Sequence, residues 1–401
     1  MIRQLPAWTV WALLLLPLVI SPLLGLLTPY VALLVIIPLF VVTLVRRQGF
    51  AAYASYDARA LLGIFGLFAI ICVVTADSVS DTLRAFNFTM FLAYGAIALF
   101  LERQSSHDAA GRVTLLAATG VIIGAVQIAV SAVVEHLPRP AGLNLGPIVL
   151  SNALLALGFV AFGGVLVRRD RRSWLYVLVP LVAIVATAIT GSRGPLIAMP
   201  FAAVAAAVFV WHERFRRSVR AGLAGATGLA VLLGVGVVAM LQGRANSLLG
   251  IVGSGGAVVD ESTRQRFVLY RAGWQSFLHS PWIGHGWGNI ISSIRPFLSW
   301  KDLWLSAWLP QLHNDVLNFA VASGVVGVAA YLVVISTPIV GALLSPRDSL
   351  RAFRLYAATV LTIIYVGGGL TDLMFGFEFH TFLFAMLTAI ILHYCRDKRP
   401  A

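Results

Sequence analysis

Residues 311–324 read QLHNDVLNFAVASG, a polar cluster that runs directly into an apolar segment. An apolar helix of about 20 residues crosses the hydrocarbon core of a bilayer, and 316–343 has that character. His313 then lies at the mouth of a membrane-spanning helix. Two interpretations stand. His313 is an ordinary helix-start residue, with Asn314 and Asp315 in the first turn, or it is a general base for a hydroxyl that arrives from water.

The whole chain shares this membrane character. Its 401 residues are 59% hydrophobic and only 11% charged, whereas a soluble domain carries about 25% charged residues. This composition predicts an all-α polytopic membrane protein. The two cysteines, Cys72 and Cys395, fit neither a disulfide framework nor zinc-ligand spacing, and no nucleotide-binding motif occurs in the sequence. We therefore expect no cofactor and no metal.

Apolar runs of sufficient length predict about twelve membrane spans. They lie at 7–27, 29–45, 58–76, 83–101, 113–134, 146–167, 174–190, 195–211, 221–241, 316–343, 353–370 and 377–394. We interpret residues 1–401 as a single transmembrane domain. The one long segment that does not span, 242–315, is interpreted as a loop subdomain within it.

Basic residues sort the loops into two sides. With the N-terminus in the cytoplasm, the cytoplasmic loops carry 20 of the 29 Lys and Arg residues and 7 of the 16 acidic ones, so the whole net charge of +13 lies inside. This positive-inside pattern indicates topology rather than nucleic-acid binding, and it predicts that both termini are cytoplasmic and that the long loop is outside. The spans themselves are nearly free of charge, which argues against a proton relay within them.

The outside segment 242–315 holds six of the ten tryptophans. Aromatic residues at helical spacing predict a helix over 264–278, which Ser280-Pro281 ends before a glycine-rich loop at 284–288. A short amphipathic helix over 297–309 is expected in the membrane interface. The alternative role for its tryptophans is a wall for a lipid tail or a platform on which sugar rings stack.

Three outside residues form a set suited to phosphate chemistry. Arg193 lies in the turn TGSRGP, whose glycines free the backbone for close approach to a ligand. Arg266 lies on the predicted outside helix, and His313 lies at the next span. The planar fork of arginine binds phosphate through paired hydrogen bonds. The alternatives are that Arg193 reaches lipid headgroups and that Arg266 forms a surface ion pair with Asp260 or Glu261.

Three motifs occur in a fixed order in the second half of the chain: TGSRG at 190–194, RxxxY at 266–270 followed by PWIGHGWG at 281–288, and HNxxL at 313–317. Their order and spacing, over about 185–330, resemble the superfamily of O-antigen ligases, O-antigen polymerases and protein O-oligosaccharyltransferases. These are bacterial inner-membrane glycosyltransferases.

The resemblance implies a GT-C-like, metal-independent transferase with its active site at the periplasmic face of the inner membrane. The donor would be a glycan on undecaprenyl pyrophosphate, and the acceptor would be a sugar of the lipid A core. By this resemblance Arg193 and Arg266 bind the pyrophosphate, and His313 acts as the base or positions the acceptor.

Secondary candidates lie beside these residues. They are Arg264, Asn314 and Asp315, and we expect Asp315 to hold the imidazole tautomer or to serve only as a helix-start acid. By the same resemblance the single long loop favours a ligase over a polymerase, in which two such loops are common. An O-antigen polymerase or a protein O-oligosaccharyltransferase is the alternative. A transporter of lipid-linked glycans is the alternative from another class, although transporters typically carry charged residues within their spans. No pattern indicates an oligomeric state.

Overall fold

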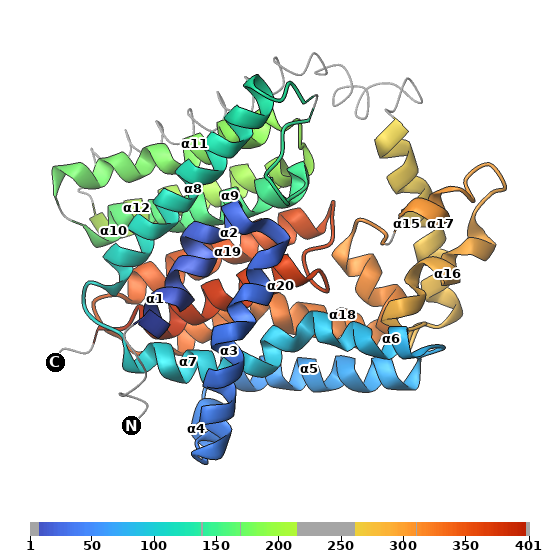
Figure 1. Ribbon diagram of the computed structural model, residues 1–401, viewed down its shortest axis with the longest axis horizontal. Helices are drawn as coiled ribbons and strands as arrows, with labels where there is room; N and C mark the ends of the chain where they lie inside the picture. Colours follow the sequence, from blue (N-terminus) through green and yellow to red (C-terminus); the bar gives the residue numbers. More distant parts are fainter. Residues whose placement is uncertain (1–7, 138, 169, 215–260, 310, 398–401) are drawn as a thin grey trace.

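A computed structural model describes residues 8–137, 139–168, 170–214, 261–309 and 311–397. Every regular element in these ranges is helical (Figure 1), which confirms the predicted all-α polytopic class. Nine stretches of the described chain are long and apolar enough to span a membrane, and a shorter apolar helix covers Glu378–Tyr394. The span predicted at 221–241 lies outside the described residues.

The first stretch, Trp8–Val45, is a hairpin of two spans. A straight helix of its 38 residues would be almost twice as long as the hydrocarbon core is thick. The chain turns at Gly25, whose φ is +57°, and α3 (Thr28–Val45) returns to pack on α1 (Trp8–Leu15) (Figure 1). A side chain at Gly25 would meet Leu145 at 2.9 Å, so only glycine fits this turn.

The remaining helices follow the predicted order. Their bounds are Ser21–Leu24 (α2), Gly49–Ala52 (α4), Tyr56–Val74 (α5), Val79–Leu83 (α6), Thr89–Arg103 (α7), Ala109–Val133 (α8), Pro147–Phe162 (α9), Gly164–Val167 (α10), Leu178–Ile189 (α11), Met199–Arg214 (α12), Glu261–His279 (α15), Ile290–Ile294 (α16), Leu305–Trp308 (α17), Asp315–Leu344 (α18), Arg351–Gly369 (α19) and Glu378–Ala389 (α20). Helix α19 packs against α9, α12 and α18, and α18 packs in turn on α5 and α15. The C-terminal spans therefore lie at the centre of the bundle.

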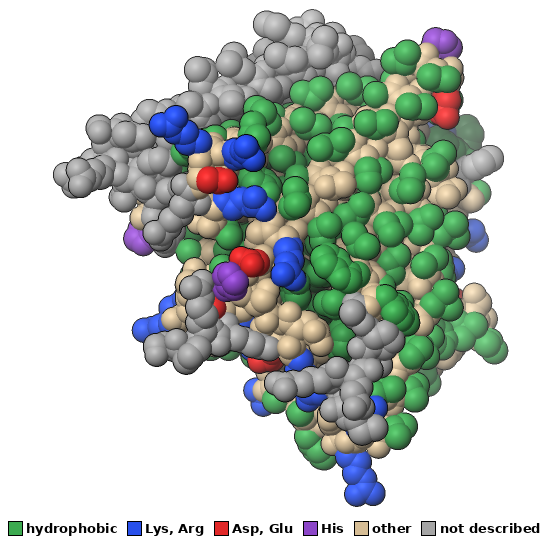
Figure 2. Space-filling view, turned by 60° about the vertical axis from the view of Figure 1, so that its left-hand side comes forward, with side chains coloured by type: hydrophobic (Ala, Val, Ile, Leu, Met, Phe, Trp, Pro, Cys, Tyr) green, Lys and Arg blue, Asp and Glu red, His purple; other side chains and the backbone are tan. Residues whose placement is uncertain are grey.

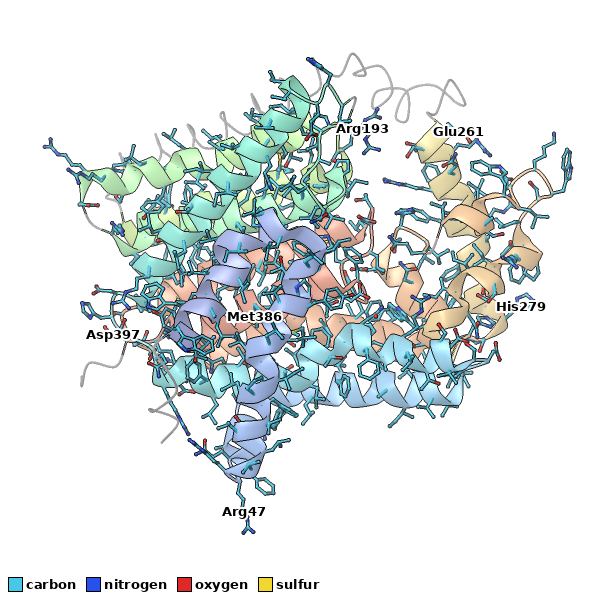
Figure 3. The ribbon with its side chains drawn as sticks, in the orientation of Figure 1. Arg47, Arg193, Glu261, His279, Met386 and Asp397 are labelled. Carbon is cyan, nitrogen blue, oxygen red and sulfur yellow. The ribbon has the colours of Figure 1, made fainter. Side chains whose placement is uncertain are left out.

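The loops gather at two opposite ends of the bundle. At one, which we call the Arg396 end, Arg396 pairs with Glu102 at 2.6 Å. At the other, the Arg193 end, the side chain of Asn289 donates to Asp77 at 2.7 Å, and Figure 3 places Arg193 there. In the charge pattern, Glu102 and Arg396 belong to one predicted side, and Asp77 and Arg193 belong to the other. Which end faces the cytoplasm stays a prediction.

The flank of the bundle is hydrophobic. Figure 2 shows hydrophobic side chains over a broad face, with most of the visible charged side chains at its left and lower margins. Leu34 is 75% exposed and Phe201 is 64% exposed. A soluble monomer rarely exposes large continuous apolar patches, whereas helices that face lipid require them.

The long loop is only partly as predicted. Helix α15 confirms the helix expected at 264–278, and it ends next to Ser280 and Pro281. The amphipathic helix expected at 297–309 is wrong in length, because only the single turn of α17 is an α-helix there. Residues 299–302 form a turn instead, in which the amide of Asp302 donates to the carbonyl of Ser299 at 2.9 Å.

Helix α18 is broken at Gly324, and the loop after α15 fills the break. Gly324 has a φ of +63°, and a side chain there would meet the backbone of Trp282 at 2.3 Å. The amide of His285 donates to the carbonyl of Val321 at 2.8 Å, and the amide of Val325 donates to the carbonyl of Pro281 at 2.7 Å. Broken backbone at membrane depth requires such partners. The loop therefore fixes α15 against the first half of α18.

Candidate functional site

His313 lies directly before α18 and has an unusual backbone. Its φ is +53°, a left-handed conformation that is uncommon for residues other than glycine. The N-terminal cap of α18 is Asn314, whose side chain accepts from the amide of Leu317 at 3.0 Å. His313 therefore lies just outside the helix with its side chain 21% exposed, rather than in the first helical turn. Backbone outliers of this kind cluster at functional sites.

The carboxylate that contacts His313 is Asp372. Nδ1 of His313 lies 3.2 Å from Oδ1 of Asp372, and Gln311 donates to the same oxygen at 3.1 Å. Burial opposes ionisation of Asp372, but the hydrogen bond and charge of His313 outweigh it, so the pKa of this carboxyl lies below its usual range. An Asp beside a His fixes the imidazole tautomer, with Nδ1–H toward the carboxylate. Nε2 is then the nitrogen left for a substrate.

Asp372 was missed by the sequence analysis. It follows α19, and 59 residues separate it from His313. No local spacing connects the two, because the pair forms only when α19 packs against α18. The available signal was an acidic residue at the mouth of a predicted span on the same side as His313.

Of the two roles expected for Asp315, that of holding the imidazole is wrong, and that of an acid in the first turn of α18 is confirmed. Its Oδ1 accepts from the backbone amides of Met374 at 2.9 Å and Phe375 at 3.4 Å. The side chain is fully buried, and Gly369 has no room for a side chain because Oδ2 of Asp315 would lie 2.5 Å from it. Asp315 therefore fixes the loop that carries Asp372.

The turn that carries Arg193 is fixed by small polar residues. The hydroxyl of Thr190 donates to that of Ser192 at 2.8 Å, and both side chains are buried. A side chain at Gly194 would come within 2.2 Å of the Thr371 hydroxyl. We expected this glycine to let a ligand approach the backbone closely. In the structure the group that approaches Gly194 closely is the side chain of Thr371. This contact brings the Arg193 turn directly against the residue that precedes Asp372.

Helix α15 carries two arginines with different environments. Arg264 pairs with Glu261 at 2.7 Å and with Asp302 at 2.9 Å. The hydrogen bonds that Glu261 accepts from Arg264 and Gln265 lower its pKa to about 2. Arg266 is half-buried and has no carboxylate partner among the described residues. Glu261, one of the two acids considered as an ion-pair partner of Arg266, therefore pairs with Arg264 instead. The other acid, Asp260, lies outside the described residues.

Tyr270 connects α15 to the histidine. Its hydroxyl contacts the carbonyl oxygens of His313 at 2.8 Å and Leu370 at 3.2 Å. Burial raises the pKa of this phenol, which keeps the donor protonated, and the nearby positive charge of Arg266 acts in the opposite direction. Arg266 is thus close to the tyrosine that holds the His313 backbone.

The described residues bring the predicted groups to one end of the bundle. His313 and Asp372 are in contact, the Arg193 turn packs on Thr371, and Arg266 is linked through Tyr270. Figure 3 shows Arg193 on the same side of the molecule as Glu261, the first residue of α15. Fold and site together define a helical, polytopic membrane protein with paired His–Asp chemistry and arginines at one end.

Comparison with known families identifies the class further. Residues 177–332 match the family described as O-antigen ligase. This match over 177–332 confirms the resemblance to the O-antigen ligase/polymerase superfamily, whose members are glycosyltransferase-like enzymes. The matched region includes Arg193, Arg266 and His313 but ends before Asp372. No curated protein matches the chain.

Proposed function

We propose that the protein is an O-antigen ligase, which transfers a glycan from undecaprenyl pyrophosphate to a hydroxyl of a lipid A-core sugar. The single observation that carries the proposal is the His313–Asp372 pair, in contact at 3.2 Å at the end of the bundle that holds the Arg193 turn. The family match supports the reaction class. The donor and the acceptor are inferred from the resemblance of the motifs.

Arg193 and Arg266 bind the pyrophosphate of the donor. Both lie outside the predicted spans or at their ends, and arginine keeps its charge under all physiological conditions. The bond between the anomeric carbon and the phosphate oxygen breaks with its electron pair on the leaving pyrophosphate. Guanidinium groups placed beside that oxygen stabilise the charge as it develops.

His313 accepts the proton of the acceptor hydroxyl. Asp372 receives the hydrogen bond from Nδ1–H, and Nε2 removes the proton as the acceptor oxygen bonds to the anomeric carbon. One displacement of this kind inverts the configuration at that carbon. A positioned general base contributes about 10²–10⁴-fold to a rate, and the negative Asp372 stabilises the imidazolium that forms.

The topology that we propose brings two lipid-anchored substrates together. We assign the protein to the bacterial inner membrane, with both termini in the cytoplasm and the Arg193 end in the periplasm, in accord with the charge of the loops. The chain is a single transmembrane domain, 1–401, and 242–315 is its periplasmic loop subdomain. Donor and acceptor then meet in the outer leaflet of the same membrane.

Transfer by the purified protein tests this proposal. Wild type is incubated with undecaprenyl-pyrophosphate glycan and lipid A-core, without nucleotide, beside Arg193→Ala, Arg266→Ala and His313→Ala. Glycosylated lipid A-core from wild type alone supports the ligase. Longer lipid-linked glycan indicates a polymerase, and labelled protein indicates an oligosaccharyltransferase. Movement of the donor across vesicles without transfer to any acceptor indicates a transporter and overturns the assignment as an enzyme.

A further inference from the structure

A second titratable cluster lies at the Arg396 end, opposite the candidate site. His393 belongs to the last turn of the C-terminal span, Ile390–Tyr394, which is π-helical, and its residue is 2% exposed. Asp57, in the first turn of α5, is 4% exposed. Asp57 lies directly before the predicted span 58–76, and His393 lies near the end of the predicted span 377–394. Ionisable residues buried in a membrane protein are rare and usually functional.

The Nε2 side of the His393 ring has one fixed partner. Oδ2 of Asp57 lies 2.6 Å from Nε2 of His393, and the same oxygen accepts from the hydroxyl of Tyr94 at 2.6 Å. An ionised carboxylate can only accept hydrogen bonds. Nε2 therefore carries a proton, and this contact holds for both the neutral and the charged ring.

The Nδ1 side has two partners that require opposite protonation states. Nη2 of Arg396 lies 3.2 Å from Nδ1, and Oε2 of Glu102 lies 3.5 Å from it. A guanidinium only donates, so it requires a bare Nδ1, whereas a carboxylate only accepts and requires Nδ1–H. Arg396 and Glu102 also pair with each other at 2.6 Å. One proton on Nδ1 thus decides which of them the ring binds.

We propose that His393 is a proton-binding site that latches the C-terminal turn to α5 and α7. The neutral ring accepts from Arg396. The protonated ring donates to Glu102 while it keeps Asp57. The π-helical turn fits this role, since such turns are frequent at functional sites.

The charges around the His393 ring decide which of its two protonation states binds its partners more tightly. In direct contact with the ring, the carboxylates of Asp57 and Glu102 oppose one guanidinium, that of Arg396. Around them, α7 contributes Tyr94 and α8 contributes Arg112, whose charge acts on Tyr394. The Arg354–Asp348 pair lies next to Cys395 and is neutral in sum. The protonated ring is therefore the better bound, and the latch contributes most stability at acidic pH.

The stability that the latch contributes is lost as the pH rises and the imidazole loses its proton. The ordinary pKa of a histidine is about 6.5. The latch is independent of the proposed function, because no step of glycan transfer uses it. It lies at one end of the helical run Glu378–Tyr394, and the loop that carries Asp372 leads into the other end. We assign it to the stability of that run.

Thermal unfolding of the whole protein in lipid nanodiscs, measured between pH 5 and 8.5, tests the latch. Wild type is compared with His393→Gln, which cannot titrate, and with His279→Gln as a matched control at an exposed histidine of α15. We expect Tm of wild type and of the control to fall by about 2–4 °C across neutrality, and this step to be absent from His393→Gln. Parallel curves for wild type and His393→Gln overturn the proposal.

A second variant keeps the test decisive if His393→Gln does not fold. Glu102→Gln removes the negative charge that favours the protonated ring, at a position that is 41% exposed, and preserves the size of the side chain. The step in Tm should shrink to less than half of the wild-type step. An unchanged step in Glu102→Gln shows that the transition belongs to other groups.

Discussion

A histidine–aspartate pair occupies each end of the bundle, and the two pairs are built differently. At the Arg193 end, His313 and Asp372 are 3.2 Å apart, and the histidine side chain is 21% exposed. At the Arg396 end, His393 and Asp57 are 2.6 Å apart, and both side chains are almost fully buried. The first pair joins two loops, whereas the second joins two helices.

The difference lies in what the far nitrogen of each ring contacts. Both nitrogens of His393 have protein partners, Asp57 on one side and Arg396 with Glu102 on the other. Only Nδ1 of His313 has a protein partner among the described residues, namely Asp372. A ring enclosed on both sides can respond to protons but has no access to a substrate. A ring held on one side keeps a nitrogen for chemistry.

The largest expected effect separates the two histidines by activity. His313→Ala should lower the initial rate of glycan transfer by about 10²–10⁴-fold, because it removes the base. His393→Gln, assayed at a pH and temperature where it is folded, should stay within about threefold of wild type. Equal losses in both variants would contradict the division of roles. Full activity of His313→Ala would return this histidine to a helix-start residue.

The next effect compares two arginines two residues apart on α15. Arg266→Ala should lower transfer by about 10–100-fold, the size expected for a lost charge-assisted hydrogen bond to the pyrophosphate. Arg264→Ala removes only exposed ion pairs with Glu261 and Asp302, which contribute little, so its rate should change by less than about threefold. The initial rate at limiting donor measures both. A greater loss in Arg264→Ala would exchange the two assignments.

A third variant tests the contact between the Arg193 turn and the Asp372 loop. Gly194→Ala places a methyl group about where the Thr371 hydroxyl lies, since the two would be 2.2 Å apart. We expect transfer to fall by about tenfold, because displacement of site residues by an ångström is costly. Thr371→Ala in the same chain should restore part of the rate. The double variant would remain as slow as Gly194→Ala if the effect came from elsewhere.

The sequence was sufficient for the spans that the structure describes and for one part of the site. Apolar length predicts the helices, and the hairpin at Gly25 confirms that Trp8–Val45 is two spans. Arg193, Arg266 and His313 lie in local motifs, so their types and order were readable in the chain. These features depend on neighbours in the sequence.

Partners from distant spans were not predictable in this way. Asp372 meets His313 across 59 residues and His393 meets Asp57 across 336, and only helix packing determines which acid reaches which ring. Nearness in sequence left two roles open for Asp315, to hold the imidazole of His313 or to serve only as a helix-start acid. Its helical position instead directs it toward the amides of Met374 and Phe375.

The smallest effect distinguishes the two pairs by the sign of their pH dependence. The pKa of Asp372 lies below its usual range because its contact with His313 outweighs burial. A carboxyl of this kind contributes stability above its unfolded pKa, about 3.9, and loses it as the pH falls through the lower folded value. Asp372→Asn should therefore lower Tm by about 2 °C near pH 6, and its difference from wild type should shrink toward pH 3.

The latch at His393 loses its stability in the opposite direction, as the pH rises. A single series of unfolding curves on wild type, Asp372→Asn and His393→Gln thus assigns the acid-side loss to one end of the bundle and the neutral-side loss to the other. If the Tm difference of Asp372→Asn stays constant down to pH 3, the His313 contact does not lower the pKa of Asp372. Asp372 would then orient the His313 ring through their hydrogen bond without stabilising its positive charge. The activity of His313 as a base would depend on this orientation alone.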